Sequence, residues 1–327
     1  MLASCRCPCG AWERVVIVVC GEALMDVFSA GDTAAGMRLD ARVGGSPFNV
    51  AVGLARLGQP VSFFAALSRG FLGERLMQAL AVEGVATAAV ARSDAPTTIS
   101  LVGLDAHGVP SYAFYGAGAA DRALQAGDLA RLPANISVVN VGSYATVVEP
   151  IASTLRALIE LERGKGSAGA LIAFDPNIRL NVEPDLPRWR AQLTWMLPRT
   201  DLLKVSEEDL ALLQPGADLD AFAADALAHG VNAVVVTRGA QGALGWTARG
   251  KVGVPPVAVE VIDTVGAGDT FQAALLTWLA EHGALSAAAM ETLAADDWRS
   301  ALAFAARAAA ITCSRRGADM PRRDELR

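Results

Sequence analysis

The sequence predicts an α/β protein: a doubly wound, mostly parallel β-sheet flanked by helices, with a small β-sheet lid. Short apolar runs, many of them β-branched, alternate with segments of helical pattern, which is typical of a parallel sheet covered on both faces. Two stretches break this alternation with strand-like segments that no helix separates. The chain has 327 residues, 53% hydrophobic and 19% charged, and can therefore bury the core that such a fold needs.

The first strand and the first helix have the clearest signals. Val15 to Cys20 is a short β-branched run and predicts a buried central strand. Residues 46–58 predict a helix, because Ser46 can cap it, Pro47 suits its first turn and Gly58 can close it.

The rest of the sheet is expected from further apolar runs separated by helical segments. In chain order these are a strand at Val61–Ala65, a helix at Leu72–Glu83, strands at Val138–Val141, Leu171–Asp175, Leu202–Val205 and Val234–Thr237, and a closing helix at Ala301–Thr312. A helical stretch precedes each of the last four strands.

The lid is expected from the two stretches that lack helices. Met37 to Val43 and Thr97 to Tyr115 read as strands, with a hairpin turn at residues 105–108, so lid strands are placed near 31–43 and 94–118. Such a sheet would cover the carboxyl edge of the main sheet, where open α/β folds bind their ligands. We expect a single domain over residues 15–322, with a disordered leader at 1–14 and a short tail at 323–327.

Charge and hydropathy exclude several classes of protein. The net charge is −6, which disfavours binding to a phosphate backbone, so no nucleic acid partner is expected. No apolar run approaches the roughly 20 residues that span a bilayer, so we expect a cytoplasmic protein without a membrane partner. Cys5, Cys7 and Cys9 lack the paired spacing of a metal site.

The most informative segment runs from Val261 to Phe271. A β-branched run leads into a Gly266-Ala267-Gly268 loop, and a long helix is expected to begin at Asp269. Backbone N–H groups of such a loop, at the positive end of a helix, can form an anion hole for a phosphoryl group. From the local sequence, Asp269 is either a helix cap or a base that activates an attacking hydroxyl. The phosphate-binding pattern G-x-x-x-x-G-K-[ST] is absent, and no G-x-G-x-x-G follows the first strand.

Two signatures resemble those of the ribokinase-like (PfkB) carbohydrate kinases, and in particular their fructokinase-like branch. Asp263-Thr-Val-Gly-Ala-Gly-Asp269 is similar to the carboxyl-terminal signature D-T-x-G-A-G-D. The segment from Gly44 to Gly58 resembles the amino-terminal signature, G-G-x-x-x-N followed by A-x-x-L-A-x-L-G. The agreement extends from about Val15 to Pro321, and the family's fold is the one expected above.

The resemblance implies roles for the sugar and phosphate side of the site. Asp269 matches the catalytic base, and the N–H groups of Gly266, Ala267 and Gly268 match the anion hole. The substrate side is implied to include Asp26, Gly44, Gly45, Asn49 and Arg179, the last within a D-P-N-x-R segment.

The resemblance also implies ATP, Mg²⁺ and a monovalent cation, with K⁺ as the candidate. The nucleotide side is implied to include Lys204, Ser206, Thr237, Gly239 and Gly242. Where the family commonly has N-x-x-E near magnesium, this chain has Ser206-Glu-Glu-Asp209, so Asp209 is expected to reach Mg²⁺ through water. A monovalent cation site is implied at Asp263, Val265, Thr312 and Gly317, although Pro321 stands where a hydroxyl residue often helps.

The lid segment favours fructose as the substrate. It resembles that of bacterial fructokinases, and Gly116 stands where kinases of 2-keto-3-deoxygluconate tend to place an arginine. Ribokinase and 2-keto-3-deoxygluconate kinase remain alternatives. From other classes, a catalytically silent sugar- or nucleotide-binding regulator and a dinucleotide-dependent oxidoreductase remain open. The resemblance also implies a homodimer formed through the lid.

Overall fold

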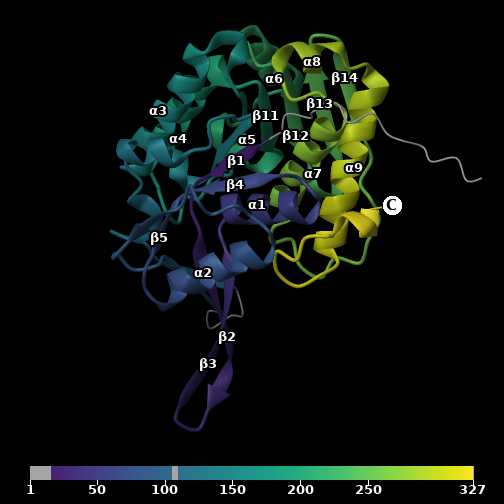
Figure 1. Ribbon diagram of the computed structural model, residues 1–327. Helices are drawn as coiled ribbons and strands as arrows, with labels where there is room; N and C mark the ends of the chain where they lie inside the picture. The colour runs from purple at the N-terminus through teal and green to yellow at the C-terminus, as the bar shows by residue number, and fades with distance from the viewer. Residues whose placement is uncertain (1–15, 105–109, 327) are drawn as a thin grey trace, which may run out of the picture.

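A computed structural model describes residues 16–104 and 110–326, and its centre is an eight-stranded sheet (Figure 1). The expected leader at residues 1–14 and the expected hairpin turn at residues 105–108 lie outside these ranges. Six strands run parallel, and two antiparallel strands extend one edge. In spatial order they are β14 (Gly250–Val254), β13 (Ala243–Thr247), β12 (Ala233–Thr237), β11 (Leu202–Ser206), β10 (Leu171–Asp175), β9 (Val138–Gly142), β1 (Ile17–Cys20) and β4 (Val61–Phe64).

Two hydrophobic cores, one on each face of the sheet, hold the helices in place. Side chains alternate along β1, so that Ile17 and Val19 join one core while Val18 and Cys20 join the other. The first core lies under α1 (Ser46–Arg56), α2 (Phe71–Val82), α7 (Ala267–Glu281), α8 (Ala287–Thr292) and α9 (Ala295–Cys313). The second lies under α3 (Ile151–Gly164), α4 (Leu186–Met196), α5 (Glu207–Leu213) and α6 (Leu219–Ala228). The doubly wound fold is thereby confirmed.

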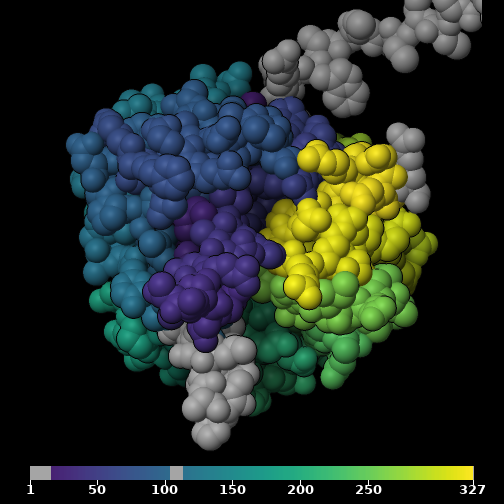
Figure 2. Space-filling model, turned by 90° about the horizontal axis from the view of Figure 1, so that it is seen from below, coloured from purple at the N-terminus to yellow at the C-terminus, as the bar shows by residue number. Residues whose placement is uncertain are grey.

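A separate four-stranded sheet forms an arm that projects from the body (Figure 1). Its order is β3 (Gly36–Gly44), β2 (Leu24–Thr33), β7 (Ile99–Leu104) and β8 (Pro110–Tyr115). Seen from below, the arm lies beside the carboxyl-terminal segment (Figure 2). Arg42 of β3 comes so close to this segment that a Cβ on Gly317 would lie 3.2 Å from its Nη1. A further pair of short strands, β5 (Ala66–Ser68) and β6 (Ala91–Ser93), completes the β-structure of the described residues.

Several expected boundaries were wrong. Strand β2 lies where a loop was expected after Gly21, and the hairpin β13–β14 was not predicted. Helix α7 begins at Ala267 instead of Asp269. No α-helix precedes β9 directly, because the segment between β8 and β9 forms two short 3₁₀ turns, Ala120–Arg122 and Ala126–Arg131.

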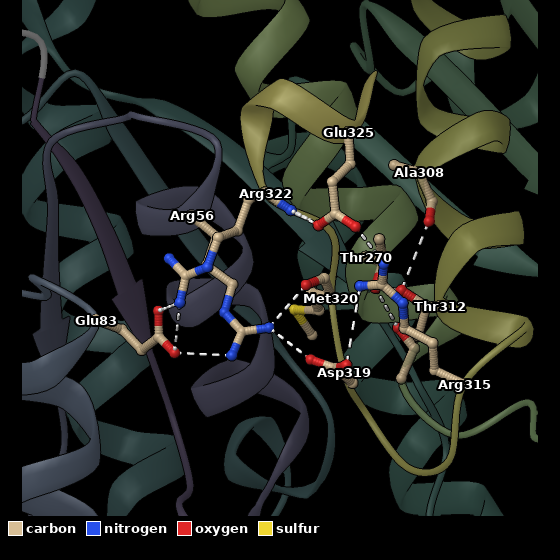
Figure 3. A network of polar contacts seen from close by, with 11 residues as sticks. Arg56, Glu83, Thr270, Ala308, Thr312, Arg315, Asp319, Met320, Arg322 and Glu325 are labelled. Atoms are coloured by element: carbon tan, nitrogen blue, oxygen red, sulfur yellow. Dashed lines mark hydrogen bonds and ion pairs between the residues drawn. The ribbon is translucent and has the colours of Figure 1, made fainter. Parts of the chain in front are cut away.

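The carboxyl-terminal segment is tied to α1 by a polar network (Figure 3). Arg56 donates to Glu83 at 2.7 Å, to Asp319 at 2.8 Å and to the carbonyl oxygen of Met320 at 2.7 Å. The last described turn, Arg323–Leu326, is packed as well, since Arg323 pairs with Glu281. Within the two described ranges, no helix is both long enough and apolar enough to cross a membrane.

Candidate active site

Two cavities meet at the loop before α7. The first, of about 460 Å³, is polar, and we call it the polar cavity; Asp26, Asn49 and Asp269 are among the residues that line it. The second, of about 640 Å³, is lined largely by apolar side chains that include Val257 and Phe271, and we call it the apolar cavity. The two share the lining residues Asn177, Thr264 and Gly268, so a ligand in one can touch a ligand in the other.

Asp269 lines the polar cavity next to Gly268, which both cavities share, and it is held by side chains from another part of the chain. Its carboxylate accepts hydrogen bonds from the Ser46 hydroxyl at 2.6 Å and the Asn49 amide at 2.8 Å. The expected capping roles are both wrong: Gly266 is the N-cap of α7 and Gly45 that of α1, and neither Ser46 nor Asp269 caps a helix. Burial raises the pKa of Asp269, and the two hydrogen bonds oppose that rise.

The loop before α7 presents backbone N–H groups to the cavities. Gly266 adopts φ 78°, and a Cβ there would lie 2.6 Å from the Cβ of Ala318. Both the backbone conformation and the lack of space therefore require glycine. The first N–H groups of a helix have no intrahelical acceptor and can bind an anion. The N–H of Ala267 already donates to the carbonyl oxygen of Thr264 at 3.2 Å. Of the three residues of the expected anion hole, Gly268 is the one that lines both cavities.

The expected sugar-side residues converge on the polar cavity, with one exception. Asp26, Gly45, Asn49 and Arg179 line it. Gly44 does not line it but makes room for Asp26, because a Cβ on Gly44 would lie 2.2 Å from Oδ2 of that carboxylate. Burial also raises the pKa of Asp26.

Sequence reasoning missed one acidic residue that lines the polar cavity. Glu22 lines it and is 1% exposed, and burial raises the pKa of its carboxyl to about 8. The signal was present, because Gly21-Glu22 directly follows the first buried strand, where α/β folds place ligand-binding residues. Tyr144 and Phe114 form an aromatic wall with ring centroids 5.6 Å apart.

Gly116, expected to mark the absence of an arginine near the substrate, does not line the polar cavity. A Cβ at this position would lie 2.5 Å from the Phe114 ring and 2.8 Å from a guanidinium nitrogen of Arg122. The position therefore faces the back of the aromatic wall, and its identity says little about the charge of the sugar.

The expected nucleotide-side residues line the apolar cavity: Lys204, Ser206, Thr237, Gly239 and Gly242. Gly242 has φ 82°, and a Cβ there would lie 2.1 Å from the carbonyl oxygen of Val254, so this turn requires glycine. The apolar walls and the glycine-bearing turn suit a flat base with a phosphate chain that runs toward Gly268.

Asp209 lines the apolar cavity as well, and it is the candidate metal residue. Its Oδ1 accepts from the backbone N–H of Ile178 at 3.2 Å. Burial, and then the neighbouring charge of Asp175, raise its pKa to about 6. Among the described residues no group of three His, Cys, Asp or Glu side chains is placed to hold a metal ion, and the single carboxylate of Asp209 suits Mg²⁺, which usually keeps several of its waters.

Three of the four expected monovalent cation residues are joined by hydrogen bonds through Asp263, and the fourth, Thr312, bonds a residue of α7. The carboxylate of Asp263 accepts from the N–H of Gly317 at 2.8 Å and from the N–H of Val265 at 3.0 Å. The Thr312 hydroxyl bonds that of Thr270 in α7 at 2.8 Å. These bonds brace the loop before α7 against the carboxyl-terminal segment.

A polar cavity lined by the Asp269 carboxylate and an apolar cavity that adjoins it at Gly268 suit an enzyme that moves a group between two ligands. A model of the pfkB family of carbohydrate kinases matches residues 16–324. Fructokinases from Rhizobium leguminosarum bv. trifolii and Klebsiella pneumoniae are similar to this chain. The first is 38% identical over 264 residues, or 81% of this chain and 79% of that protein. The second is 36% identical over 271 residues, or 82% and 85%.

Solved structures agree with the sequence relatives. A fructokinase from Xylella fastidiosa with bound ATP superposes with a TM-score of 0.84 at 28% identity, over 96% of this chain and 97% of that one. One from Vibrio cholerae with fructose, ADP and calcium ion bound gives 0.80 at 27% identity, over 96% and 98%. The chain belongs to the pfkB family of carbohydrate kinases, and it is an ATP-dependent sugar kinase. The oxidoreductase alternative is thereby excluded.

Proposed function

We propose that this kinase phosphorylates fructose at its primary hydroxyl to give fructose 6-phosphate, with Asp269 as the general base. The hydroxyl oxygen forms a bond to the γ-phosphorus of ATP, the bond from that phosphorus to the β–γ bridging oxygen breaks, and ADP leaves. The hydroxyl proton passes to the carboxylate of Asp269. The observation that carries the proposal is the position of this carboxylate, which is buried in the lining of the polar cavity next to Gly268, a residue that both cavities share, and is held by Ser46 and Asn49.

The charge of the polar cavity supports a neutral sugar. Glu22, Asp26 and Asp269 place three carboxyl groups around it, against the guanidinium of Arg179. The carboxylates of Asp26 and Asp269 suit a polyol, whose hydroxyls need acceptors, and they repel a sugar acid, while Glu22, with a pKa of about 8, can donate a hydrogen bond near neutral pH. Asp26, Gly45 and Asn49 are proposed to contact the sugar, while Gly44 supports Asp26 and Arg179 lies toward the phosphoryl group.

The apolar cavity is proposed to bind ATP with Mg²⁺. Thr237, Gly239, Gly242 and Ser206 would surround the nucleotide, and Asp209 would hold the hydrated ion through water. The ion would neutralise charge on the phosphates. Replacing Asp209 with Asn should raise the KM for ATP at pH 8 more than at pH 5, because the pKa of Asp209 is about 6 and the wild-type carboxyl is protonated at pH 5. An effect of equal size at both pH values would contradict the role of its charge.

A monovalent cation and a homodimer complete the proposal. K⁺ bound near Asp263, Val265, Thr312 and Gly317 would stiffen the loop before α7, so replacing K⁺ with tetramethylammonium should lower kcat. The arm exposes 65% of Met37 and 50% of Leu39, an apolar surface suited to a second copy. Light scattering should give the mass of a dimer for the wild type and of a monomer for Leu39→Asp.

A coupled ADP-release assay over a panel of sugars tests the substrate. Fructose should give a higher kcat/KM than ribose, and a far higher one than 2-keto-3-deoxygluconate. A preference for the keto acid would contradict the neutral-sugar assignment. Binding of sugar and ATP without turnover of any sugar would identify a silent regulator instead of an enzyme.

A further inference from the structure

A buried lysine lies between the sheet and the anion-binding loop. Lys204 of β11 is 3% exposed, and its Nζ lies 2.6 Å from Oδ2 of Asp175 at the end of the neighbouring strand β10. Because β10 and β11 are parallel neighbours, both side chains emerge at the carboxyl edge of the sheet, directly below the site.

The lysine ammonium lies beside the glycine that both cavities share. A Cβ placed on Gly268 would lie 3.1 Å from Nζ of Lys204, and Lys204 itself lines the apolar cavity. Glycine at position 268 therefore lets the ammonium lie close to the start of α7. A phosphoryl group at the start of α7 would meet both the ammonium and the loop N–H groups.

The hydrogen bonds of this ion pair are incomplete. An ammonium has three N–H donors, and among the described residues Asp175 is its one hydrogen-bond partner. The other carboxylate oxygen of Asp175, Oδ1, is buried and has no partner there either. A buried ion pair is stable only when its remaining donors and acceptors are satisfied, so a pair left open toward a cavity points to a ligand that completes it.

The surrounding charges favour an anionic ligand next to Lys204. Asp175, Asp209 and Asp269 face the ammonium, and Arg179 is the second cation near these acids. An incoming triphosphate needs fixed positive charge here, because the nearby carboxylates would otherwise repel it.

We propose that Lys204 is a further catalytic residue, whose ammonium binds the γ-phosphoryl oxygens while they pass from ATP to the sugar, and that Asp175 positions it. The inference rests on the proposed kinase reaction and leaves its bonding changes as written above. In a loose transition state, negative charge spreads over the equatorial oxygens of the transferring group, where a fixed cation stabilises it most. A lysine that only neutralised Asp175 in the fold would contribute nothing at this step.

Two variants that remove the charge of Lys204 separate its proposed catalytic role from a purely structural role as the partner of Asp175. Lys204→Met removes the cation but leaves Asp175 unpaired, which can destabilise the fold. The double variant Lys204→Met/Asp175→Asn removes both charges and keeps the shapes close to the original. We expect kcat to fall by about 10²–10³ in both, as when other transition-state donors are removed. The matched control is Lys165→Met, which breaks a pair with the buried Glu162 (2.7 Å) away from both cavities and should keep kcat.

Binding of a transition-state mimic gives a second readout. Calorimetry with fructose present should show that ADP plus aluminium fluoride binds the double variant about 10²–10³ times more weakly than the wild type, matching the loss in kcat. ADP alone should bind both proteins alike. Wild-type kcat in the double variant, or equal weakening of ADP and of the mimic, would overturn the role of Lys204. A wild type that phosphorylates no sugar would instead overturn the kinase proposal itself.

Discussion

At the scale of single residues, the site depends on how Asp269 is kept ready to accept a proton. Burial raises its pKa, whereas the donors Ser46 and Asn49 favour the charged form and lower it. In the proposed mechanism Asp269 accepts the proton as the anion. Activity should therefore be present above the pKa of Asp269 and be lost as the pH falls through it.

Ser46→Ala should move the acid limb of the pH profile upward. The substitution removes a hydrogen bond to the charged carboxylate, so the pKa of Asp269 rises and a higher pH is needed to deprotonate it. The measurement is kcat/KM for fructose against pH, with the exposed Ser300→Ala as control. An unchanged or lowered acid limb would contradict the electrostatic role of Ser46.

The sequence identified Asp26, Asn49 and Asp269 but missed Glu22 and the hydrogen bond from Ser46 to Asp269. Asn49 and Asp269 were expected from the two signatures and Asp26 from its match to a family aspartate, and all three line one cavity. Ser46 was expected to cap a helix, because its position before Pro47 allows that role. Its actual contact with a residue more than two hundred positions away depends on tertiary packing, which local sequence does not encode.

At the scale of elements, the parallel strands of the main sheet could be predicted, whereas strand β2 of the arm and the segment that follows the edge strand β14 could not. The central strands are buried on both faces and read as continuous apolar runs. Strand β2 continues into the exposed arm, where Ser29 to Thr33 show no apolar alternation. Val261 and Ile262 are β-branched but form no strand, because such residues form one only where neighbouring backbone supplies partners, and this segment follows the edge strand β14.

The arm is anchored to the body by Asp121, which is 2% exposed. Its carboxylate accepts from the hydroxyls of Thr98, just before β7, and of Tyr144, the latter at 2.7 Å. The Tyr144 ring packs edge-on against Phe114 of β8, and both rings wall the polar cavity. Asp121 therefore joins the base of the arm to the aromatic wall of the polar cavity.

Asp121→Asn should loosen this anchor. The amide offers one acceptor oxygen instead of two, so one buried hydroxyl loses its partner, at a cost of about 1–3 kcal/mol. We expect a lower Tm and a higher KM for fructose, with the KM for ATP little changed. Asp94→Asn, on a side chain that is 88% exposed, serves as control. A raised KM for ATP alone would contradict the anchoring of the sugar wall.

At the scale of the whole molecule, two signatures far apart in sequence close into one site. Residues 44–49 begin α1 on one side, residues 263–269 begin α7 on the other, and α1 packs directly on α7. The doubly wound order could be predicted, because regular alternation leaves few topologies. The polar network around Arg56 could not, because it joins three separate segments (Figure 3).

Arg56→Met should destabilise the fold at neutral pH by about 1–3 kcal/mol, the range for hydrogen bonds to charged groups, because Glu83 loses its half-buried partner. The Arg56 guanidinium holds the pKa of Glu83 below its usual range. This stability is present above the ordinary pKa of a glutamate and is lost as the pH falls through the lowered one. The difference in urea midpoint between the wild type and Arg56→Met should therefore be smaller at acidic pH than at neutral pH. A difference that grew in acid would contradict this account.

The most direct test of the mechanism is Asp269→Asn, measured by kcat with saturating ATP and magnesium and by Tm. Gly266 caps α7, so the substitution leaves the helix start intact, and the Asn49 amide can turn to present its oxygen to the new amide. We predict a normally folded protein that still binds ATP, with kcat lowered by about 10²–10⁴, the usual contribution of a positioned base. Near-normal kcat in a normally folded Asn variant would contradict the assignment of Asp269 as the base.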